Sequence, residues 1–305
     1  AVKSGDKTDQ DMKLYADDIN QREPIANIRL IHKIIAHNAM TPEVMDENNL
    51  GFLKSQKSEP DAGLWILPSH IQHACDSSAV VTFVGDFIFI RAKYNLKAGD
   101  EVTIPYIESV ASLEERQTEM KQNQASCDCR LCILEQNESK SLTAKRTQLV
   151  SDFKKKFKLG EKNDLEVVTR IVDGLKETYH KAGRASPGPQ QLLYLPYTAL
   201  GAVYLARDQR KKAAESFELA LRALGFTDDH EEYLLKGGVK GTRFPPTILL
   251  PMAPMTAIHI YHYYWNADEY DLAEKWFRIA RGLDRIVHGG DEAVFKRLYH
   301  SFIAL

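Results

Sequence analysis

Cys127, Cys129 and Cys132 lie within a run of six residues, in a C-x-C-x-x-C pattern. Three thiolates this close in sequence can face one ion, and zinc usually takes four such ligands in a closed tetrahedral site. Cys75 is the one other cysteine of the chain. Two alternatives remain open: Cys75 is a small buried apolar residue and the cluster binds nothing, or the cluster holds a redox pair. The polar and charged neighbours of the run favour a metal clip at the surface over a packed core.

Composition excludes several classes of protein. The 305 residues carry 40 Lys and Arg against 42 Asp and Glu, so phosphate neutralisation cannot dominate and we expect no direct nucleic-acid binding. Residues 1–13 are polar, unlike a secretion signal. The most apolar stretch, residues 247–255, is short and broken by Pro251 and Pro254, so no membrane span is expected. Four cysteines are too few for a disulfide scaffold. The sequence predicts a soluble intracellular protein, cytoplasmic or nuclear.

The N-terminal part begins with a polar segment, residues 1–22. After Pro24, isoleucines recur at helical spacing and predict a helix. A second short helix is expected with Thr41 as its cap. Residues 63–67 form a short apolar run that suits a strand or a turn of helix. The isoleucines of the first helix are Ile25, Ile28, Ile31, Ile34 and Ile35.

Strand signals dominate the next segment. Residues 80–84 and 87–91 are β-branched and aromatic, and Gly85-Asp86 between them suits a type II′ hairpin turn. Residues 95–100 read as a turn. Residues 101–106 alternate as a third strand, with Pro105 placing its end at an edge. Residues 63–107 are therefore expected to form a small β-rich module.

From about Ser139 onward the pattern becomes helical. Two segments share spacings typical of tetratricopeptide repeats, offset by 60 residues (273 − 213). The intervening insert, residues 225–251, is rich in Gly and Pro, so the pattern predicts an irregular helical array. An ordinary helical bundle with chance matches is the alternative. An apolar stripe precedes the repeats at Leu165, Val168, Ile171 and Leu175; the matched positions are Leu200, Gly201, Tyr204, Ala213, Phe217 and Ala220, then Tyr264, Ala273, Phe277 and Ala280.

Four motifs in order resemble the SET-domain methyltransferases. Residues 67–79 (L-P-S-H-I-Q-H-A-C-D-S-S-A) are similar to the N-H-S-C-x-P-N motif, and the hairpin follows. Residues 95–107 (N-L-K-A-G-D-E-V-T-I-P-Y-I) resemble I-x-x-G-E-E-x-x-x-x-Y-I. The cysteine run about twenty residues later is similar to the post-SET zinc motif. The helical region that follows makes the SMYD type the nearest likeness, covering residues 25–135 by motif and 140–305 by architecture.

The resemblance implies roles for individual residues. Cys75 aligns with the motif cysteine that joins the post-SET triad on zinc, which predicts one Zn²⁺ on Cys75, Cys127, Cys129 and Cys132. Tyr106 aligns with the tyrosine of the methyl-transfer channel, where a phenol orients amine and sulfonium. Gln72 and His73 align with the Asn-His pair that contacts S-adenosylmethionine. The alternatives are a half-buried strand-end tyrosine for Tyr106, and for His73 a core histidine or a replacement fourth zinc ligand. Arg130 is expected to offset part of the charge of the zinc centre.

Several positions depart from the family pattern. Gln72 replaces the motif Asn, and Ser77 and Ser78 replace its Pro and Asn. Residues 124–126 (Q-A-S) stand where the SMYD type has an aromatic residue against adenine. The early SET strands and their G-x-G cofactor loop do not precede the motif, and the chain opens with Ala1. These departures imply either the remainder of a longer enzyme or a degraded cofactor site.

The expected fold class is α+β: a β-rich SET module with its insert helices (residues 1–109), a post-SET zinc segment (110–136) and a helical tetratricopeptide-like domain (137–305). The predicted function is S-adenosylmethionine-dependent methylation of a protein lysine, including a histone, or of another amine. The alternative is a non-catalytic or repurposed scaffold that binds a peptide, a partner or a different small molecule.

Overall fold

The computed structural model describes residues 27–40, 62–84, 86–122, 125–162, 164–183, 189–236 and 248–303. The segment 1–22, the start of the first helix at Pro24, the helix expected at Thr41, the hairpin glycine Gly85 and Gln124 lie outside these ranges, as does much of the 225–251 insert. The described part is mostly helical with few strands.

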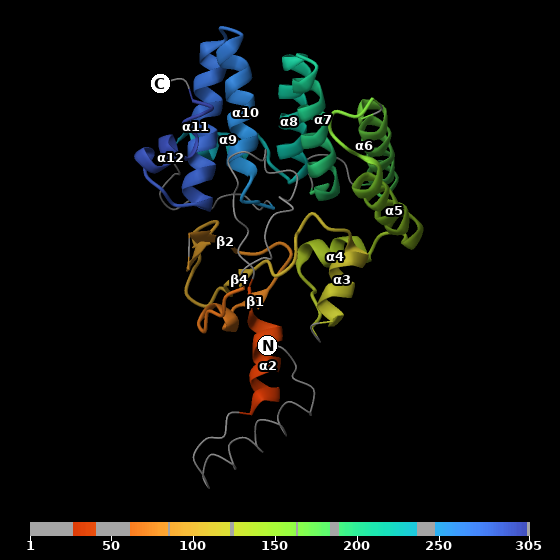
Figure 1. Ribbon diagram of the computed structural model, residues 1–305, viewed down its shortest axis with the longest axis vertical. Helices are drawn as coiled ribbons and strands as arrows, with labels where there is room; N and C mark the ends of the chain where they lie inside the picture. The colour runs from red at the N-terminus through yellow and green to blue at the C-terminus, as the bar shows by residue number, and fades with distance from the viewer. Residues whose placement is uncertain are drawn as a thin grey trace.

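The first described element is helix α2, Ile28–Asn38, capped by Asn27, whose side chain accepts from the Leu30 amide. The predicted helix is thus present, and its isoleucine stripe is largely exposed: Ile31, Ile34 and Ile35 are 42–48% accessible. The helix projects from the rest of the described chain (Figure 1). A short bridge between Met40 and Gly63 and a 3₁₀ turn, η1 (Pro68–His70), come before the strands. Residues 63–67 were expected to form a strand or a turn of helix, and of these Gly63 forms the bridge.

Two pairs of strands follow. Strand β1 (Gln72–His73) runs parallel to β4 (Thr103–Ile104), while β2 (Ala79–Val84) and β3 (Phe87–Ala92) form the predicted hairpin. The third strand is shorter than the predicted 101–106, because Pro105 lacks an amide donor and Ser78 Oγ donates to the Glu101 carbonyl. The 63–107 segment is therefore less β-rich than expected.

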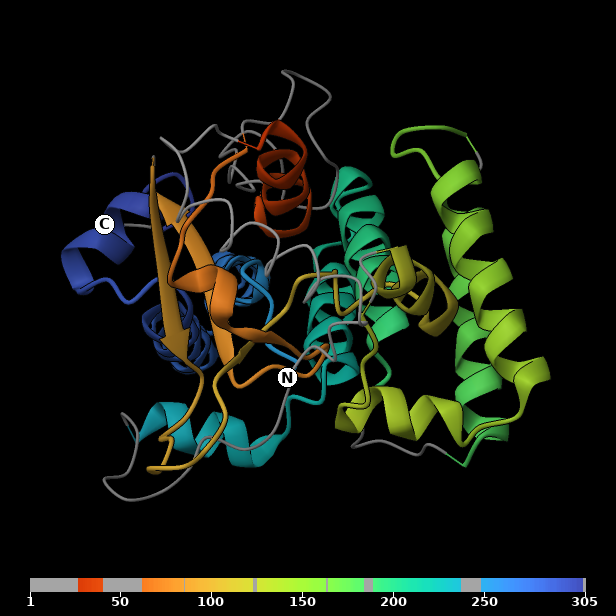
Figure 2. The same ribbon diagram turned by 90° about the horizontal axis from the view of Figure 1, so that it is seen from below.

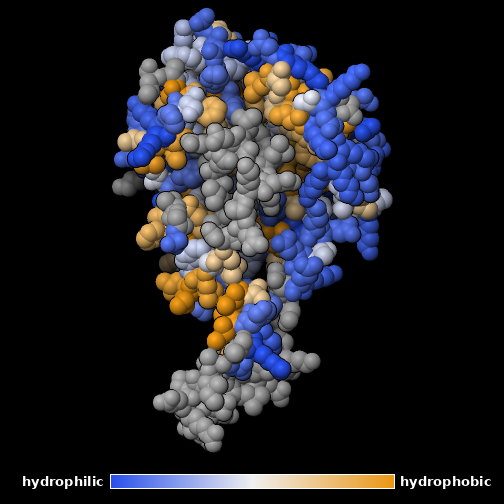
Figure 3. Space-filling view, viewed as in Figure 1, coloured by the Kyte–Doolittle hydropathy of each residue, from blue (hydrophilic) through white to orange (hydrophobic). Residues whose placement is uncertain are grey.

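The strand region and the segment that leads into it expose an apolar surface. Figure 3 shows apolar side chains gathered over the strand region, just above α2. Ile66, Leu67 and Phe87 are 72–81% exposed. A two-stranded sheet is marginal alone, and this one is supported on one side by α11, beside which it lies in Figure 2.

Beyond Ile104, the described residues contain helices and no further strand. Helices α3 (Leu113–Gln122) and α4 (Arg130–Gln136) precede the long pair α5 (Lys140–Lys156) and α6 (Asp164–Lys181). A 3₁₀ turn, η2 (Gln191–Leu193), then leads into α7 (Tyr194–Ala206) and α8 (Arg210–Ala223). The last elements are α9 (Asp228–Leu235), α10 (Ala253–Asn266), α11 (Tyr270–Val287) and α12 (Glu292–Leu298).

The 60-residue offset is visible in backbone geometry. The α7–α8 turn has Asp208 in the left-handed region (φ 54°), and the α10–α11 turn has Asp268 there (φ 59°). In both turns the amide of the second helix's N-cap residue donates back to a tyrosine carbonyl, Gln209 to Tyr204 and Glu269 to Tyr264. The two helix pairs therefore repeat one hairpin design.

Two apolar cores hold these elements together. One joins α8, α10 and α11 and includes Val80 of the hairpin. The other joins α6, α7 and α8 and includes Cys75 and Cys132. Cys75 and Cys132 thus sit where the strand region meets the helices. Among the described helices, none has both the length and the apolar character of a bilayer span.

Candidate metal centre and neighbouring tyrosine

The four cysteines converge on one point. The sulfur of Cys75 lies 3.6 Å from that of Cys132 and 3.9 Å from that of Cys127. One ligand atom from each of the four, Cys129 included, lies within 4.8 Å of all the others. A tetrahedron with Zn–S bonds of about 2.3 Å has S···S edges of about 3.8 Å. The donor set therefore fits a thiolate-bound metal ion, and this cluster could hold one.

Local structure explains the convergence. Cys127 and Cys129 are two residues apart in a segment without helix, and Cys129 is the N-cap of α4, with an extended backbone (φ −60°, ψ 164°). Alternate residues of an extended segment face the same side. Cys132 follows in the first turn of α4, whose start is fixed by the Ile133 amide donating to the Cys129 carbonyl at 2.9 Å. Cys75 arrives from the end of β1.

The cluster is more buried than its polar neighbours suggested. Cys75 and Cys132 are each 1% exposed and pack in the apolar core with Leu131 and Val110. The expectation of a surface clip was wrong for these two residues, because the neighbouring helices cover them. Cys127 and Cys129 are half-buried. The reading of Cys75 as an isolated apolar residue does not match its sulfur contacts.

Electrostatics oppose four thiolates in this space without a counter-charge. Contact with the sulfur of Cys127, then with those of Cys129 and Cys132, raises the pKa of Cys75 far above its ordinary range, and burial adds to the rise. Each neighbouring sulfur disfavours a further negative charge. A divalent cation at the centre would remove this penalty, as metal binding requires deprotonated thiols.

A buried cation also lies beside the sulfurs. A guanidinium nitrogen of Arg116, on α3, is 3.9 Å from the Cys132 sulfur and forms a buried ion pair with Glu135 of α4. Gln191 donates to the other Glu135 oxygen at 2.7 Å. Burial alone would lower the pKa of Arg116, but Glu135 and the Cys75 sulfur outweigh it and raise the pKa.

Arg130 was expected in this role, but its guanidinium pairs with Asp76 at 2.7 Å and its side chain is 53% exposed. Arg116 was not predicted, because it is one charged residue on a polar helix. The one available signal was its position four residues before Met120, because residues four apart lie on the same face of a helix.

The strand pair brings Tyr106 and His73 together. The register places Gln72 opposite Thr103 and His73 opposite Ile104. The Tyr106 amide donates to Nδ1 of His73 at 2.9 Å, and the Tyr106 hydroxyl donates to the Ile71 carbonyl. The two rings lie 5.4 Å apart. The Nε2 atom of His73 lies 3.2 Å from the Cys75 sulfur, so the tyrosine, the histidine and the cysteine cluster are one continuous site.

The side chain of Tyr106 is partly exposed to solvent. Its side chain is 44% exposed, and partial burial raises its pKa. Gln72, opposite Thr103 in the strand pair, is half-buried. Neither of the two cavities described below is lined by Gln72, His73 or Tyr106. Among the described residues, neither of these two cavities is therefore a cradle for S-adenosylmethionine beside Tyr106.

Ser77 and Ser78, which depart from the family motif, are buried and satisfied. Ser77 Oγ donates to the Ala79 carbonyl at 2.7 Å. Ser78 Oγ accepts from the Thr103 amide at 2.9 Å, while the Ser78 amide donates to the Thr103 hydroxyl at 2.9 Å. The two serines thus tie the turn after Cys75 to β4 through side-chain hydrogen bonds.

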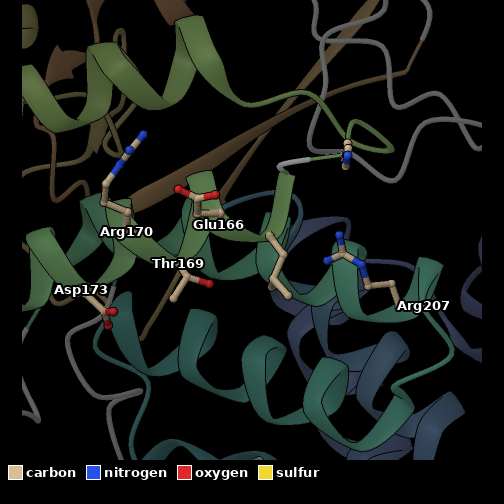
Figure 4. Close-up of a pocket in the computed structure, with 7 residues that line it drawn as sticks. Glu166, Thr169, Arg170, Asp173 and Arg207 are labelled. Carbon is tan, nitrogen blue, oxygen red and sulfur yellow. The ribbon is translucent and has the colours of Figure 1, made fainter.

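Two cavities lie in the helical part. One, of about 970 Å³, is lined by α6 and by Arg207, which pairs with Asp164 at 2.6 Å. Figure 4 shows Glu166, Thr169 and Asp173 projecting from the same helix. The other, of about 310 Å³, lies between α8 and α10, with His259 and Phe217 in its wall.

The comparisons with known proteins identify relatives of part of this chain. A methyltransferase of Gibberella zeae is 26% identical over 212 residues, 66% of this chain and 29% of that protein. Histone-lysine N-methyltransferase SMYD3 of Mus musculus is 28% identical over 97 residues, 32% of this chain and 23% of the relative. A SET and MYND domain-containing protein of Dictyostelium discoideum is 30% identical over 82 residues, 26% of this chain and 24% of the relative.

The curated relatives are SMYD-type SET and MYND methyltransferases, so the resemblance predicted from the motifs is confirmed, at low identity and over part of the chain. No family model matches the chain. The chain spans 29% or less of the length of each of these three relatives.

Proposed function

We propose that this chain is part of a SET-type methyltransferase that transfers a methyl group from S-adenosylmethionine to a lysine of a protein, including a histone, or to another amine. Relatives named as methyltransferases, one of them a histone-lysine methyltransferase, support the class of reaction. The observation that carries the proposal is Tyr106, held half-exposed beside the four-cysteine cluster by the β1–β4 pair.

The proposal assigns Tyr106 the catalytic role and Gln72 and His73 positions next to the cofactor. S-adenosylmethionine would supply the methyl group. Tyr106 would contribute through its position. Its backbone amide donates to His73 and its hydroxyl donates to the Ile71 carbonyl, and these two bonds fix the ring. The exposed face of the ring is open to a substrate. A side chain fixed in this way orients an amine without reorganising.

The proposed architecture is α+β, with a SET module in residues 1–109, a post-SET zinc segment in 110–136 and a tetratricopeptide-like domain in 137–305. Zinc on Cys75, Cys127, Cys129 and Cys132 would join the first two. The repeated turns at Asp208 and Asp268 support the third. The strand region exposes several apolar side chains, and exposed apolar patches mark surfaces that another segment covers. This is consistent with a strand region that is one part of a larger SET sheet.

We further propose a cytoplasmic or nuclear location, because a tetrathiolate cluster suits a reducing compartment. A protein or peptide substrate is the expected partner.

The α6 cavity favours a second candidate function, a scaffold that binds a peptide. Lys162, Arg170 and Arg207 alternate there with Glu166 and Asp173 over a cavity of about 970 Å³. Mixed charges of this kind suit the polar backbone and side chains of an extended peptide, and helical arrays offer such surfaces.

Titration calorimetry with S-adenosylmethionine separates the two functions. We expect weak or absent binding to the 305-residue chain alone and binding by the full-length polypeptide that contains it. The same preparation should then transfer labelled methyl groups to histone protein. Absence of both binding and transfer in the full-length polypeptide would overturn the methyltransferase proposal and leave the peptide-binding scaffold.

A further inference from the structure

His73 lies between the cysteine cluster and Tyr106 and contacts both. Its Nδ1 atom is 2.9 Å from the Tyr106 amide nitrogen, and its Nε2 atom is 3.2 Å from the Cys75 sulfur. The ring is half-buried. Each ring nitrogen therefore has a partner within the chain.

The amide contact determines where the proton of a neutral His73 ring lies. A backbone N–H can only donate, so Nδ1 must accept and cannot carry a proton. The proton of a neutral imidazole is then on Nε2, the atom that points at Cys75. The contact between Nε2 and the sulfur is therefore an N–H···S hydrogen bond in which the histidine donates.

This arrangement excludes His73 as a metal ligand. Coordination through Nε2 needs a free lone pair on that atom, which would leave the ring with no proton on either nitrogen. The four sulfurs already complete a tetrahedral set. Histidine therefore stands outside the ligand shell, as a donor to one ligand.

We infer that His73 is a positioning residue that couples the metal cluster to Tyr106: it donates to the Cys75 thiolate from Nε2 and holds the Tyr106 backbone from Nδ1. The Tyr106 half of the inference rests on the proposed function, and the metal half does not. Hydrogen bonds to ligand atoms tune metal affinity, typically by about 10–100-fold.

Neighbouring hydrogen bonds hold His73 and Cys75 firmly against the segment that carries Tyr106. The Ala74 amide donates to the Ile104 carbonyl at 3.1 Å, so the backbone on either side of His73 is paired with β4. The buried hydroxyl of Ser109 donates to the Cys75 carbonyl at 2.6 Å. A displacement of Cys75 on metal loss would therefore be transmitted to the segment that carries Tyr106.

Two substitutions separate the two contacts. In His73→Asn the amide can keep an acceptor near the Nδ1 position but has no donor that reaches the sulfur. In His73→Gln the longer side chain can place its amide donor near the Nε2 position and loses the Nδ1 acceptor. His70→Asn is the matched control, because His70 is exposed three residues earlier.

Metal readouts test the first contact without any activity. Zinc affinity is measured by competition with a chelator, and the thiolate–metal absorption bands are recorded after Co²⁺ substitution. We expect His73→Asn to bind zinc about 10–100-fold more weakly and to shift the Co²⁺ bands. His73→Gln and His70→Asn should stay within about threefold of the unsubstituted protein.

The proton position is measured directly in the zinc-bound protein. A two-bond ¹H–¹⁵N correlation spectrum with labelled histidine distinguishes the two neutral tautomers. We expect the Nε2–H form for His73. An Nδ1–H form, or unchanged zinc affinity and Co²⁺ bands in His73→Asn, would overturn the metal half.

Steady-state kinetics of the full-length polypeptide test the Tyr106 half. His73→Gln should lower kcat about 10-fold or more, a larger factor than any rise in KM for S-adenosylmethionine. A rise in KM with unchanged kcat would show that His73 acts through the cofactor alone and would overturn this half. If the unsubstituted protein shows no methyl transfer at all, the proposed function fails, while the zinc and tautomer measurements still decide the metal half.

Discussion

A guanidinium nitrogen of Arg116 lies 3.9 Å from the sulfur of Cys132, and both residues are 1% exposed. The same guanidinium pairs with Glu135, which accepts a further hydrogen bond from Gln191. This buried chain runs from the cysteine cluster through α3 and α4 to η2, which leads into α7. A zinc ion on four thiolates carries a net charge of −2, and a buried cation at hydrogen-bond distance offsets part of it.

Substituting Arg116 should therefore weaken both the metal site and the fold. We expect Arg116→Met to lower zinc affinity about 10–100-fold. It should also cost about 3–5 kcal/mol of unfolding free energy, because Glu135 is left buried without its cation. Chelator competition and urea unfolding measure the two effects.

A matched arginine provides the control for Arg116. Arg130→Met removes a half-exposed partner of Asp76 and should cost no more than about 1 kcal/mol. The double substitution Arg116→Met with Glu135→Gln should recover part of the lost stability. Equal effects of the two arginine substitutions on zinc affinity would show that Arg116 has no special place at the cluster.

Removing one sulfur should abolish tight metal binding. In Cys75→Ser, the tetrahedral set is incomplete, and the loop of about fifty residues between Cys75 and Cys127 is no longer closed by the metal. We expect about one zinc per chain in the unsubstituted protein and much less in the variant, with a lower Tm. Elemental analysis and calorimetry of protein purified without chelator measure both. Ser126→Ala, an exposed neighbour of Cys127, should behave as unsubstituted protein; unchanged zinc content in Cys75→Ser would remove Cys75 from the ligand set.

The sequence was informative where chemistry is concentrated in short runs or repeated at fixed spacing. Cys127, Cys129 and Cys132 are visible as one motif, and the positions of Gly201 and Phe217 follow from the repeat. Contacts that depend on tertiary packing have no such pattern in the sequence. Arg116 is indistinguishable from the solvated charges around it, and the two-residue strands β1 and β4 are too short for a periodic signal, so the contact between His73 and Tyr106 could not be predicted.

The exposed isoleucines of α2 show what helical spacing does not predict. Helical spacing predicted a helix after Pro24, and the structure has α2 at Ile28–Asn38, yet Ile31, Ile34 and Ile35 remain 42–48% exposed in the described part of the chain. Periodicity reports an apolar face and does not report what covers it.

Removing the Tyr106 hydroxyl should reduce catalysis more than binding. The hydroxyl donates to the Ile71 carbonyl, so Tyr106→Phe frees the ring from one of its two anchors. We expect kcat of the full-length polypeptide to fall on the order of a hundredfold, since small misplacements at a reacting centre have effects of this size. Tyr270→Phe is the control, because that exposed hydroxyl bonds to Asp268 at the far end of the helical part. Full activity in Tyr106→Phe would exclude a catalytic role.

Gly201 should be intolerant of a side chain, because a Cβ there would lie 2.7 Å from two carbons of the buried Phe217 ring. We expect Gly201→Ala to cost about 1–2 kcal/mol, overpacking outweighing the gain in helix propensity. Gly174→Ala is the control, since its nearest neighbour is a Leu149 methyl at 3.1 Å that can rotate away. Urea unfolding compares the two, and Phe217→Leu should rescue Gly201→Ala in part. Equal stability of the two alanine variants would contradict the close approach of α7 and α8.

Stability should also fall in mild acid because of His259. Its ring stacks on Phe217 at 5.0 Å, and burial, with His262 nearby, lowers its pKa from 6.5 to about 4. Below about pH 6.5 the unfolded chain takes up a proton that the folded chain does not accept until about pH 4. The contribution of the neutral ring is therefore complete above the unfolded pKa and is lost as pH falls towards the folded pKa.

Between about pH 7 and about pH 5, this one group should remove roughly 2 kcal/mol of unfolding free energy. Urea unfolding at a series of pH values measures the slope, and His259→Gln should flatten it by that amount. Other groups that titrate in this range are common to both proteins, so their contributions cancel in the difference. His70→Gln, at an exposed histidine, should keep the original slope. If His259→Gln keeps it too, the buried ring is protonated in the folded protein and the assignment of its low pKa is wrong.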